Sequence, residues 1–235
     1  MPCMFQPDHS PASQHFAPRH MRVLSFTTAS VAAILLAVPF ASAANKSAPP
    51  AKAASEYPAH DTHPDEHVTV AADPCLNPKD CSFFRSPYLQ HNILPVRVIF
   101  TNDSDEAISL DDARIQFISA ANDKIQAATD DELNRRMFTL HSTQPIHVPL
   151  DPFPIHRTPV DKKITDDGND FGFPATVIKP HSTLAGYLFY DVEGLDRPLK
   201  GAELYVKMVH TVDSKKDLFS FTVPLDKWLD ANPQH

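Results

Sequence analysis

The stretch Ile93-Leu-Pro-Val-Arg-Val-Ile-Phe-Thr101 decides the fold class of this chain, because its second half alternates in the manner of a β-strand. Apolar side chains recur at every second position along one face, at Val96, Val98 and Phe100. The polar run that begins at Asn102 competes for backbone hydrogen bonds and is typical of a turn. We therefore expect a strand that ends at this point and leads into a second strand.

The same pattern of short apolar runs and turn residues continues through the rest of the chain. Gly186 stands inside one of these runs, where it indicates a bulge or the close approach of another backbone. Apolar residues on both faces of that run, 184–192, indicate a central strand covered on each side. The further expected strands are 68–72, 107–110, 113–119, 173–178, 202–210 and 218–223. The sequence therefore predicts an all-β fold, an immunoglobulin-like β-sandwich of seven to nine strands with one short helix, over residues 67–231.

The one short helix is expected to begin after Thr129. Thr129 and Glu132 have the spacing of a capping box, and Leu133 and Met137 lie one turn apart on a single face. The proline-rich stretch 138–165 cannot be helical and is expected to be loop or edge strand. The run 224–230 is expected to end in a helical turn that folds Trp228 back onto the domain.

Residues 21–43 have the three parts of a secretory signal. Arg22 supplies the positive charge, residues 26–38 form the apolar region, and Ala41-Ser-Ala43 is a cleavage site that predicts a mature chain from Ala44. Residues 1–20 are interpreted as a non-native upstream extension. The apolar region is shorter than the roughly 20 residues of a membrane span, although a retained anchor is the alternative. We therefore expect a protein exported to the periplasm or the extracellular space, with no membrane span after cleavage.

Residues 44–66 carry almost no large apolar side chains, so they are expected to form a disordered tether, and 232–235 a short tail. Cys75 and Cys81 lie in the exported part, where an oxidising compartment favours a disulfide between them over a metal or redox site. The formal net charge of −8 argues against nucleic acid or anionic lipid as a partner.

The histidines of segment 60–67 are candidate metal ligands. His63-Pro-Asp-Glu-His67 has the spacing of one class of zinc peptidase, but Pro64 is incompatible with the helix that this chemistry requires. His60, His63 and His67 could still bind Zn²⁺, Cu²⁺ or Ni²⁺ with modest affinity. The alternative is a solvated polar segment without a metal.

Phe153 and Ile155, flanked by prolines, form the most interesting candidate surface in the loop region. A stiff apolar ridge of this kind loses little entropy when it docks onto a partner. The alternative is a cover for an open sheet edge.

Motifs for catalysis are missing from the sequence, which has no nucleophile elbow and no phosphate-binding glycine loop. The run Asp166-Asp-Gly-Asn-Asp170 lacks the register of a calcium loop and is interpreted as a turn. We therefore expect no enzyme activity and no cofactor.

Two segments resemble a known group of proteins. The first is Pro95-Val-Arg-Val-Ile-Phe-Thr-Asn-Asp-Ser-Asp-Glu-Ala-Ile-Ser-Leu110, and the second is Ile178-Lys-Pro-His-Ser-Thr-Leu-Ala-Gly-Tyr-Leu-Phe-Tyr-Asp-Val192. Both are similar to segments of uncharacterised, exported immunoglobulin-like domains of bacterial envelope proteins, a family associated with Acidobacteria. The resemblance implies the sandwich fold and an envelope or extracellular location. It implies no activity and no site residues.

The hypothesis that follows is a non-catalytic exported binding or accessory module of the cell envelope, with another envelope protein as a possible partner. The first alternative is a periplasmic metal-binding protein that uses the histidines of segment 60–67. The second is a hydrolase on a sandwich scaffold, because a fold does not fix a function.

Overall fold

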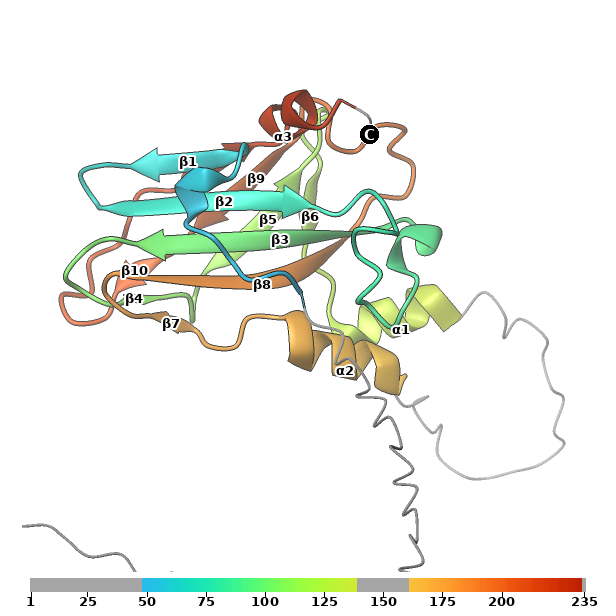
Figure 1. Cartoon of the computed structure of the whole chain (residues 1–235), viewed down its shortest axis with the longest axis horizontal. Helices are drawn as coiled ribbons and strands as arrows, with labels where there is room; N and C mark the ends of the chain where they lie inside the picture. The colour runs from blue at the N-terminus through green and yellow to red at the C-terminus, as the bar shows by residue number, and fades with distance from the viewer. Residues whose placement is uncertain (1–47, 139–160, 234–235) are drawn as a thin grey trace, which may run out of the picture. The chain divides into compact units, whose positions relative to one another are not determined.

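The computed structural model describes residues 48–138 and 161–233, and Figure 1 shows that strands dominate this part of the chain. Eleven strands in the described residues form three antiparallel sheets. The prediction of an all-β fold is confirmed at this level. No helix in the described ranges is long and apolar enough to cross a membrane.

The first sheet contains the strand that opens the sequence argument. Its order is β1-β2-β3-β8, with β1 at His60–His63, β2 at Val68–Pro74, β3 at Ile93–Asn102 and β8 at Ser182–Asp191. All ten residues of β3 are buried. Because β3 pairs with both β2 and β8, it holds the central place that the sequence assigned to 184–192. That assignment is wrong, since β8 lies at the sheet edge and its faces are covered by the core and by helices instead.

The second sheet has the order β11-β9-β5-β6, and a small third sheet has the order β10-β4-β7. A positive φ of 61° at Met208 interrupts the predicted strand 202–210 and separates β9 from β10. The strands of these two sheets are β11 (Phe221–Pro224), β9 (Glu203–Lys207), β5 (Arg114–Ile118), β6 (Lys124–Gln126), β10 (His210–Thr211), β4 (Ile108–Ser109) and β7 (Val177–Ile178). Each predicted strand overlaps an observed one, whereas β1 and β6 are not predicted, so the described residues contain eleven strands instead of seven to nine.

The two four-stranded sheets share one hydrophobic core. Val98 of β3 and Tyr190 of β8 contribute from the first sheet, and Phe117 of β5 and Phe221 of β11 contribute from the second. All four side chains are fully buried. Burial of a large apolar side chain contributes about 1.5–3 kcal/mol, so this core is the main source of the stability of the fold.

The other face of the first sheet is covered by an aromatic cluster and short helices. Four short helices surround this face: the 3₁₀ helices η1 (Ala54–Glu56) and η2 (Tyr88–His91) and the α-helices α1 (Asp130–Phe138) and α2 (Lys162–Phe171). Helices α1 and α2 lie side by side (Figure 1). The aromatic cluster consists of Phe83, Phe84, Tyr88, Phe171, Tyr187 and Phe189. We call this side of the sheet the outer face.

The predicted capping box is confirmed at the start of α1. The Thr129 backbone N–H donates to Glu132 Oε2 at 2.8 Å, and the Glu132 N–H donates to Thr129 Oγ1 at 3.4 Å. Helix α3 (Asp226–Ala231) confirms the predicted helical turn, with Trp228 buried.

Helix α2 contradicts the prediction of one helix and the interpretation of 166–170 as a turn. It also begins inside the stretch that was expected to be non-helical. Asp161 caps it by accepting a hydrogen bond from the Lys163 N–H at 2.8 Å. Its buried stripe is Ile164, Asp167 and Phe171, and the aspartate in the middle conceals the apolar period.

The prediction of a disordered tether over 44–66 is wrong for the described residues 48–66, which contain η1 and β1. Strand β1 buries few large apolar groups but satisfies its polar side chains. Thr62 Oγ1 accepts from Thr69 Oγ1 at 3.2 Å, and the Asp61 carboxylate accepts from the Thr222 N–H at 2.8 Å. The expected extension, signal and cleavage site lie outside the described residues.

Candidate functional site: a cleft at Arg97

Three polar side chains form a row across the outer face of the first sheet. Asp73 of β2 lies opposite Arg97 of β3, and Arg97 lies opposite Tyr187 of β8. Directly opposed residues in a sheet project to the same face, so these side chains are neighbours. Arg97 is 7% exposed, although its neighbours along the strand are apolar.

The guanidinium of Arg97 has an unusual environment for a buried charge. It lies over the ring of Tyr187, 5.8 Å from the ring centroid. Among the described residues it forms no salt bridge and donates no hydrogen bond to another side chain. None of its nitrogens is among the fully buried unpaired side-chain atoms of the described residues, so the guanidinium reaches the solvent-filled space beside it. An arginine that is mostly buried and still offers N–H donors to a cleft is a candidate binding group.

Asp73 contacts a different aromatic residue from the one that Arg97 contacts. Its carboxylate accepts a hydrogen bond from Trp228 Nε1 at 2.8 Å. Burial raises the pKa of Asp73 above its ordinary value, while the Trp228 hydrogen bond and the charge of Arg97 act in the opposite direction. Two opposite charges therefore face each other across β2 and β3 without forming an ion pair.

A cleft of about 440 Å³ opens over these two charges. Its lining includes Asp73, Arg97 and Tyr187, together with Tyr57 and Trp228. Burial raises the pKa of Tyr187 to about 12, so this phenol stays neutral at physiological pH. The cleft thus combines a cation, a carboxylate and aromatic walls, which are the components of a small-molecule site.

Residues 48–58, which we call the strap, lie over the outer face of the sheet. Figure 1 shows the chain before η1 crossing in front of β3 and β8. The Ala54 N–H donates to Thr101 Oγ1 of β3 at 2.8 Å, and this bond fixes the strap to the sheet. Pro49 and Pro50 line the cleft and also a second cleft of about 610 Å³, which shares Arg97 and Tyr187 with the first. Arg97 therefore lines both clefts.

The disulfide between Cys75 and Cys81 forms another wall of the cleft, in agreement with the sequence prediction. The two Cα atoms are 6.3 Å apart. The bond closes a short loop directly after β2, so it constrains the chain beside Asp73.

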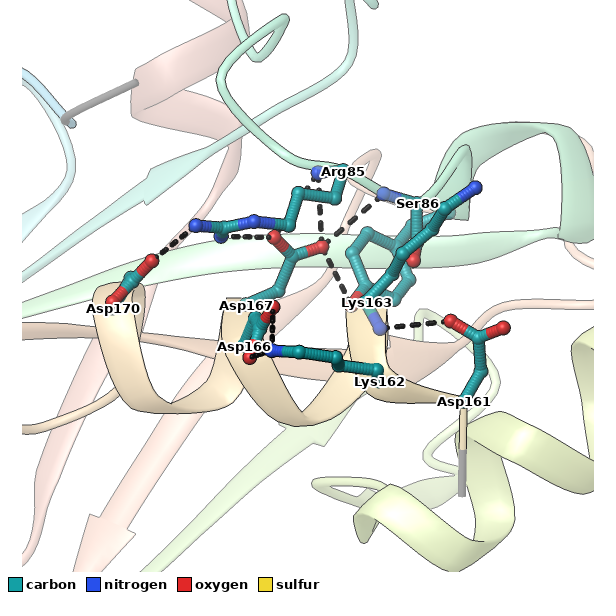
Figure 2. Close-up of polar contacts among 9 residues, drawn as sticks. Arg85, Ser86, Asp161, Lys162, Lys163, Asp166, Asp167 and Asp170 are labelled. Atoms are coloured by element: carbon teal, nitrogen blue, oxygen red, sulfur yellow. Dashed lines mark hydrogen bonds and ion pairs between the residues drawn. The ribbon is translucent and has the colours of Figure 1, made fainter. Parts of the chain in front are cut away.

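A buried carboxylate fixes the segment that follows the disulfide loop to α2, as Figure 2 shows. Asp167 is fully buried and accepts hydrogen bonds from the backbone N–H groups of Arg85 and Ser86, at 3.0 and 3.2 Å, and from the Tyr88 hydroxyl at 3.2 Å. The Arg85 guanidinium donates to Asp167 at 3.0 Å and to Asp170 at 2.5 Å. Each carboxylate oxygen of Asp167 is engaged, so this cluster anchors the segment rather than offering a reactive group.

The three predicted metal ligands do not come together. His60 Nδ1 is 2.6 Å from the Tyr57 carbonyl oxygen, and His63 Nδ1 is 2.9 Å from Glu66 Oε2 while its ring stacks on Phe221. His67 lies exposed in the turn after β1 with a φ of 53°. His60 and His63 project to opposite faces of β1, because successive side chains alternate along a strand. No group of three metal-ligating side chains occurs in the part of the chain that the structure describes.

The docking candidates Phe153 and Ile155 lie outside the described residues. In the sequence, Arg97 is one residue of the predicted strand 93–101 and carries no motif. The signal that could have singled it out is a permanent charge inside an apolar run, because such a residue must be buried or partnered when both faces of the strand are covered.

Comparison of the chain with protein-family models, with curated proteins and with solved structures finds no match. The case for a function therefore depends on the geometry of the cleft.

Proposed function

We propose that this protein is an exported, non-catalytic binding module of the bacterial cell envelope that holds a carboxylate-bearing ligand on Arg97. The observation that carries the proposal is the buried guanidinium of Arg97, which has no anionic partner among the described side chains and lies at the floor of a cleft. Arginine binds carboxylates through two parallel hydrogen bonds, and such bonds are about twice as strong as neutral ones.

The absence of a matching reactive arrangement in the described part of the site favours binding over catalysis. Tyr187 stays neutral, and Asp73 is occupied by Trp228. The fully buried carboxylate of Asp167 serves as an anchor for the segment that follows the disulfide loop. A pre-formed cleft with fixed polar groups is typical of a ligand-binding protein.

Export and an immunoglobulin-like architecture belong to the same proposal. The signal-like residues 21–43 and the disulfide are both typical of exported proteins. Two four-stranded antiparallel sheets around one core support a sandwich. The resemblance of residues 95–110 and 178–192 to exported immunoglobulin-like envelope domains is consistent with this class, and another envelope protein could receive or supply the ligand.

The test is a titration of the protein, purified from a bacterial periplasm, with acetate and benzoate while ¹⁵N–¹H NMR spectra are recorded. The expected result is a saturable shift of the Arg97 Nε–Hε resonance and of amides near it in β2, β3 and β8. Arg97→Gln should abolish the response and Arg97→Lys should weaken it. The matched control is Arg114→Gln, which changes an exposed arginine on β5 and should leave the response intact.

A wild-type protein whose Arg97 resonance does not respond to either carboxylate would overturn the proposal. This outcome is informative even if Arg97→Gln fails to fold, because the side-chain resonance of the wild-type protein is observed directly.

A further inference from the structure

We infer that the ligand of the Arg97 cleft is a zwitterion, an α-amino acid with an apolar or aromatic side chain, whose carboxylate binds Arg97 and whose ammonium group binds Asp73. This inference rests on the proposed function, because it assigns the carboxylate to the same guanidinium. It adds a second charged anchor and a class of ligand.

The first argument is that Arg97 and Asp73 remain apart although the sheet register makes them neighbours. Residues opposed across antiparallel strands have Cβ atoms about 4.5–5.5 Å apart, which is within reach of a direct ion pair. Instead, Arg97 lies over Tyr187 on one side and Asp73 bonds Trp228 on the other. Both side chains line the same cleft without pairing with each other, so a ligand that carries the opposite pair of charges a short distance apart can contact both.

The second argument is the charge balance of the cleft. Lys52 and Arg97 supply two positive groups, and three carboxylates lie on the same lining, those of Glu56, Asp73 and Asp80. A lining with more carboxylates than cations repels phosphates and other polyanions. A zwitterion, which has no net charge, is favoured over an anion because it can use both signs.

The third argument is the nature of the walls. Tyr57, Phe83 and Trp228 present aromatic surface to the cleft, and its volume of about 440 Å³ lies in the range of small-molecule sites. Aromatic side chains bind apolar groups through their large contact area. An amino acid with an apolar or aromatic side chain would place that side chain against these rings while its charged end occupies the floor.

The experiment is isothermal titration calorimetry of the full exported protein with three matched probes. L-Phenylalanine carries both charges, 3-phenylpropionate lacks the ammonium group, and 2-phenylethylamine lacks the carboxylate. We expect phenylalanine to bind, 3-phenylpropionate to bind at least about tenfold more weakly through loss of one charge-assisted hydrogen bond, and phenylethylamine to show no binding.

Asp73→Asn is the decisive variant, because its amide oxygen can still accept the Trp228 hydrogen bond while the charge is removed. It should bind phenylalanine and 3-phenylpropionate equally. Asp112→Asn, which changes an exposed carboxylate outside the cleft, should keep the wild-type preference.

The possible outcomes separate the two proposals. If 3-phenylpropionate binds the wild-type protein as tightly as phenylalanine does, the zwitterion inference is overturned and the carboxylate site at Arg97 stands. If neither carboxylate binds, both proposals fail. The comparison of the three probes on wild-type protein decides the question even if Asp73→Asn does not fold.

Discussion

Both carboxylate oxygens of Asp167 lie 3.0 Å from the backbone nitrogen of Arg85, a residue 82 positions earlier in the chain. One buried side chain thus ties the segment that follows the disulfide loop to α2. This loop also provides a wall of the Arg97 cleft, so Asp167 positions the site although it does not line the cleft.

Asp167→Ala should lower the free energy of unfolding by about 3–5 kcal/mol, because it leaves buried donors of Arg85, Ser86 and Tyr88 without an acceptor. Urea unfolding followed by circular dichroism measures this change. Asp166→Ala is the matched control on the same helix. Its carboxylate pairs with the exposed Lys162, so its loss should cost no more than about 0.5 kcal/mol. Equal effects for the two variants would show that Asp167 is not the anchor.

Gly186→Ala should destabilise the protein by about 1–3 kcal/mol or more, because a Cβ at this position would lie 2.5 Å from the backbone nitrogen of Phe173. The close approach of another backbone, which the sequence suggested at this glycine, is the cause. Gly168→Ala in α2 is the contrasting change, since its nearest contact is an ordinary 3.5 Å to Asp130. Alanine also favours a helix over glycine, so this variant should gain up to about 1 kcal/mol. Melting temperatures that move in the same direction for both variants would contradict the packing described here.

The double variant Cys75→Ala/Cys81→Ala should lose about 2 kcal/mol of stability, as expected for opening a short loop. It should still fold, because Asp167 and the aromatic cluster hold the loop independently. Affinity for a ligand at Arg97 should fall, since the disulfide forms part of the cleft wall. Chemical denaturation and calorimetry measure the two effects. Unchanged affinity would separate the loop from the binding site.

The pKa of Asp73 gives a prediction for the dependence of stability on pH. Burial raises this pKa in the folded state above its ordinary value of 3.8. The folded protein therefore binds more protons than the unfolded chain between the two values, and the Asp73 contribution to stability falls as the pH rises through this window. Asp73→Asn lacks this titration, so wild-type protein should lose stability relative to the variant over the window. Urea midpoints of both proteins at a series of pH values test the sign, and a relative gain for wild-type protein would contradict it.

The sequence predicts most strands because their apolar residues alternate, as expected when one face of a strand is buried. Strand β1 escapes this reasoning, since its residues are stabilised by hydrogen bonds to β2 and by the contact of Asp61 with Thr222, which is 161 positions away. Helix α2 escapes it because a buried aspartate, Asp167, occupies the middle of its apolar stripe. In both elements a polar side chain has a partner that is distant in sequence.

The cleft could not be predicted for the same reason. Asp73 and Arg97 become neighbours only through the register of β2 and β3, and their separation depends on Trp228 and Tyr187, which come from α3 and β8. The three histidines show the converse case. Their closeness in sequence suggested a common site, but the geometry of β1 and its turn gives each a different environment.

The most direct test of the central claim is a crystal structure of the protein grown in the presence of L-phenylalanine. The account predicts the amino acid in the cleft, with carboxylate oxygens about 2.7–2.9 Å from the Arg97 guanidinium and the ammonium group at hydrogen-bonding distance from Asp73. A structure in which Arg97 and Asp73 form a direct salt bridge and the cleft contains no amino acid would contradict it.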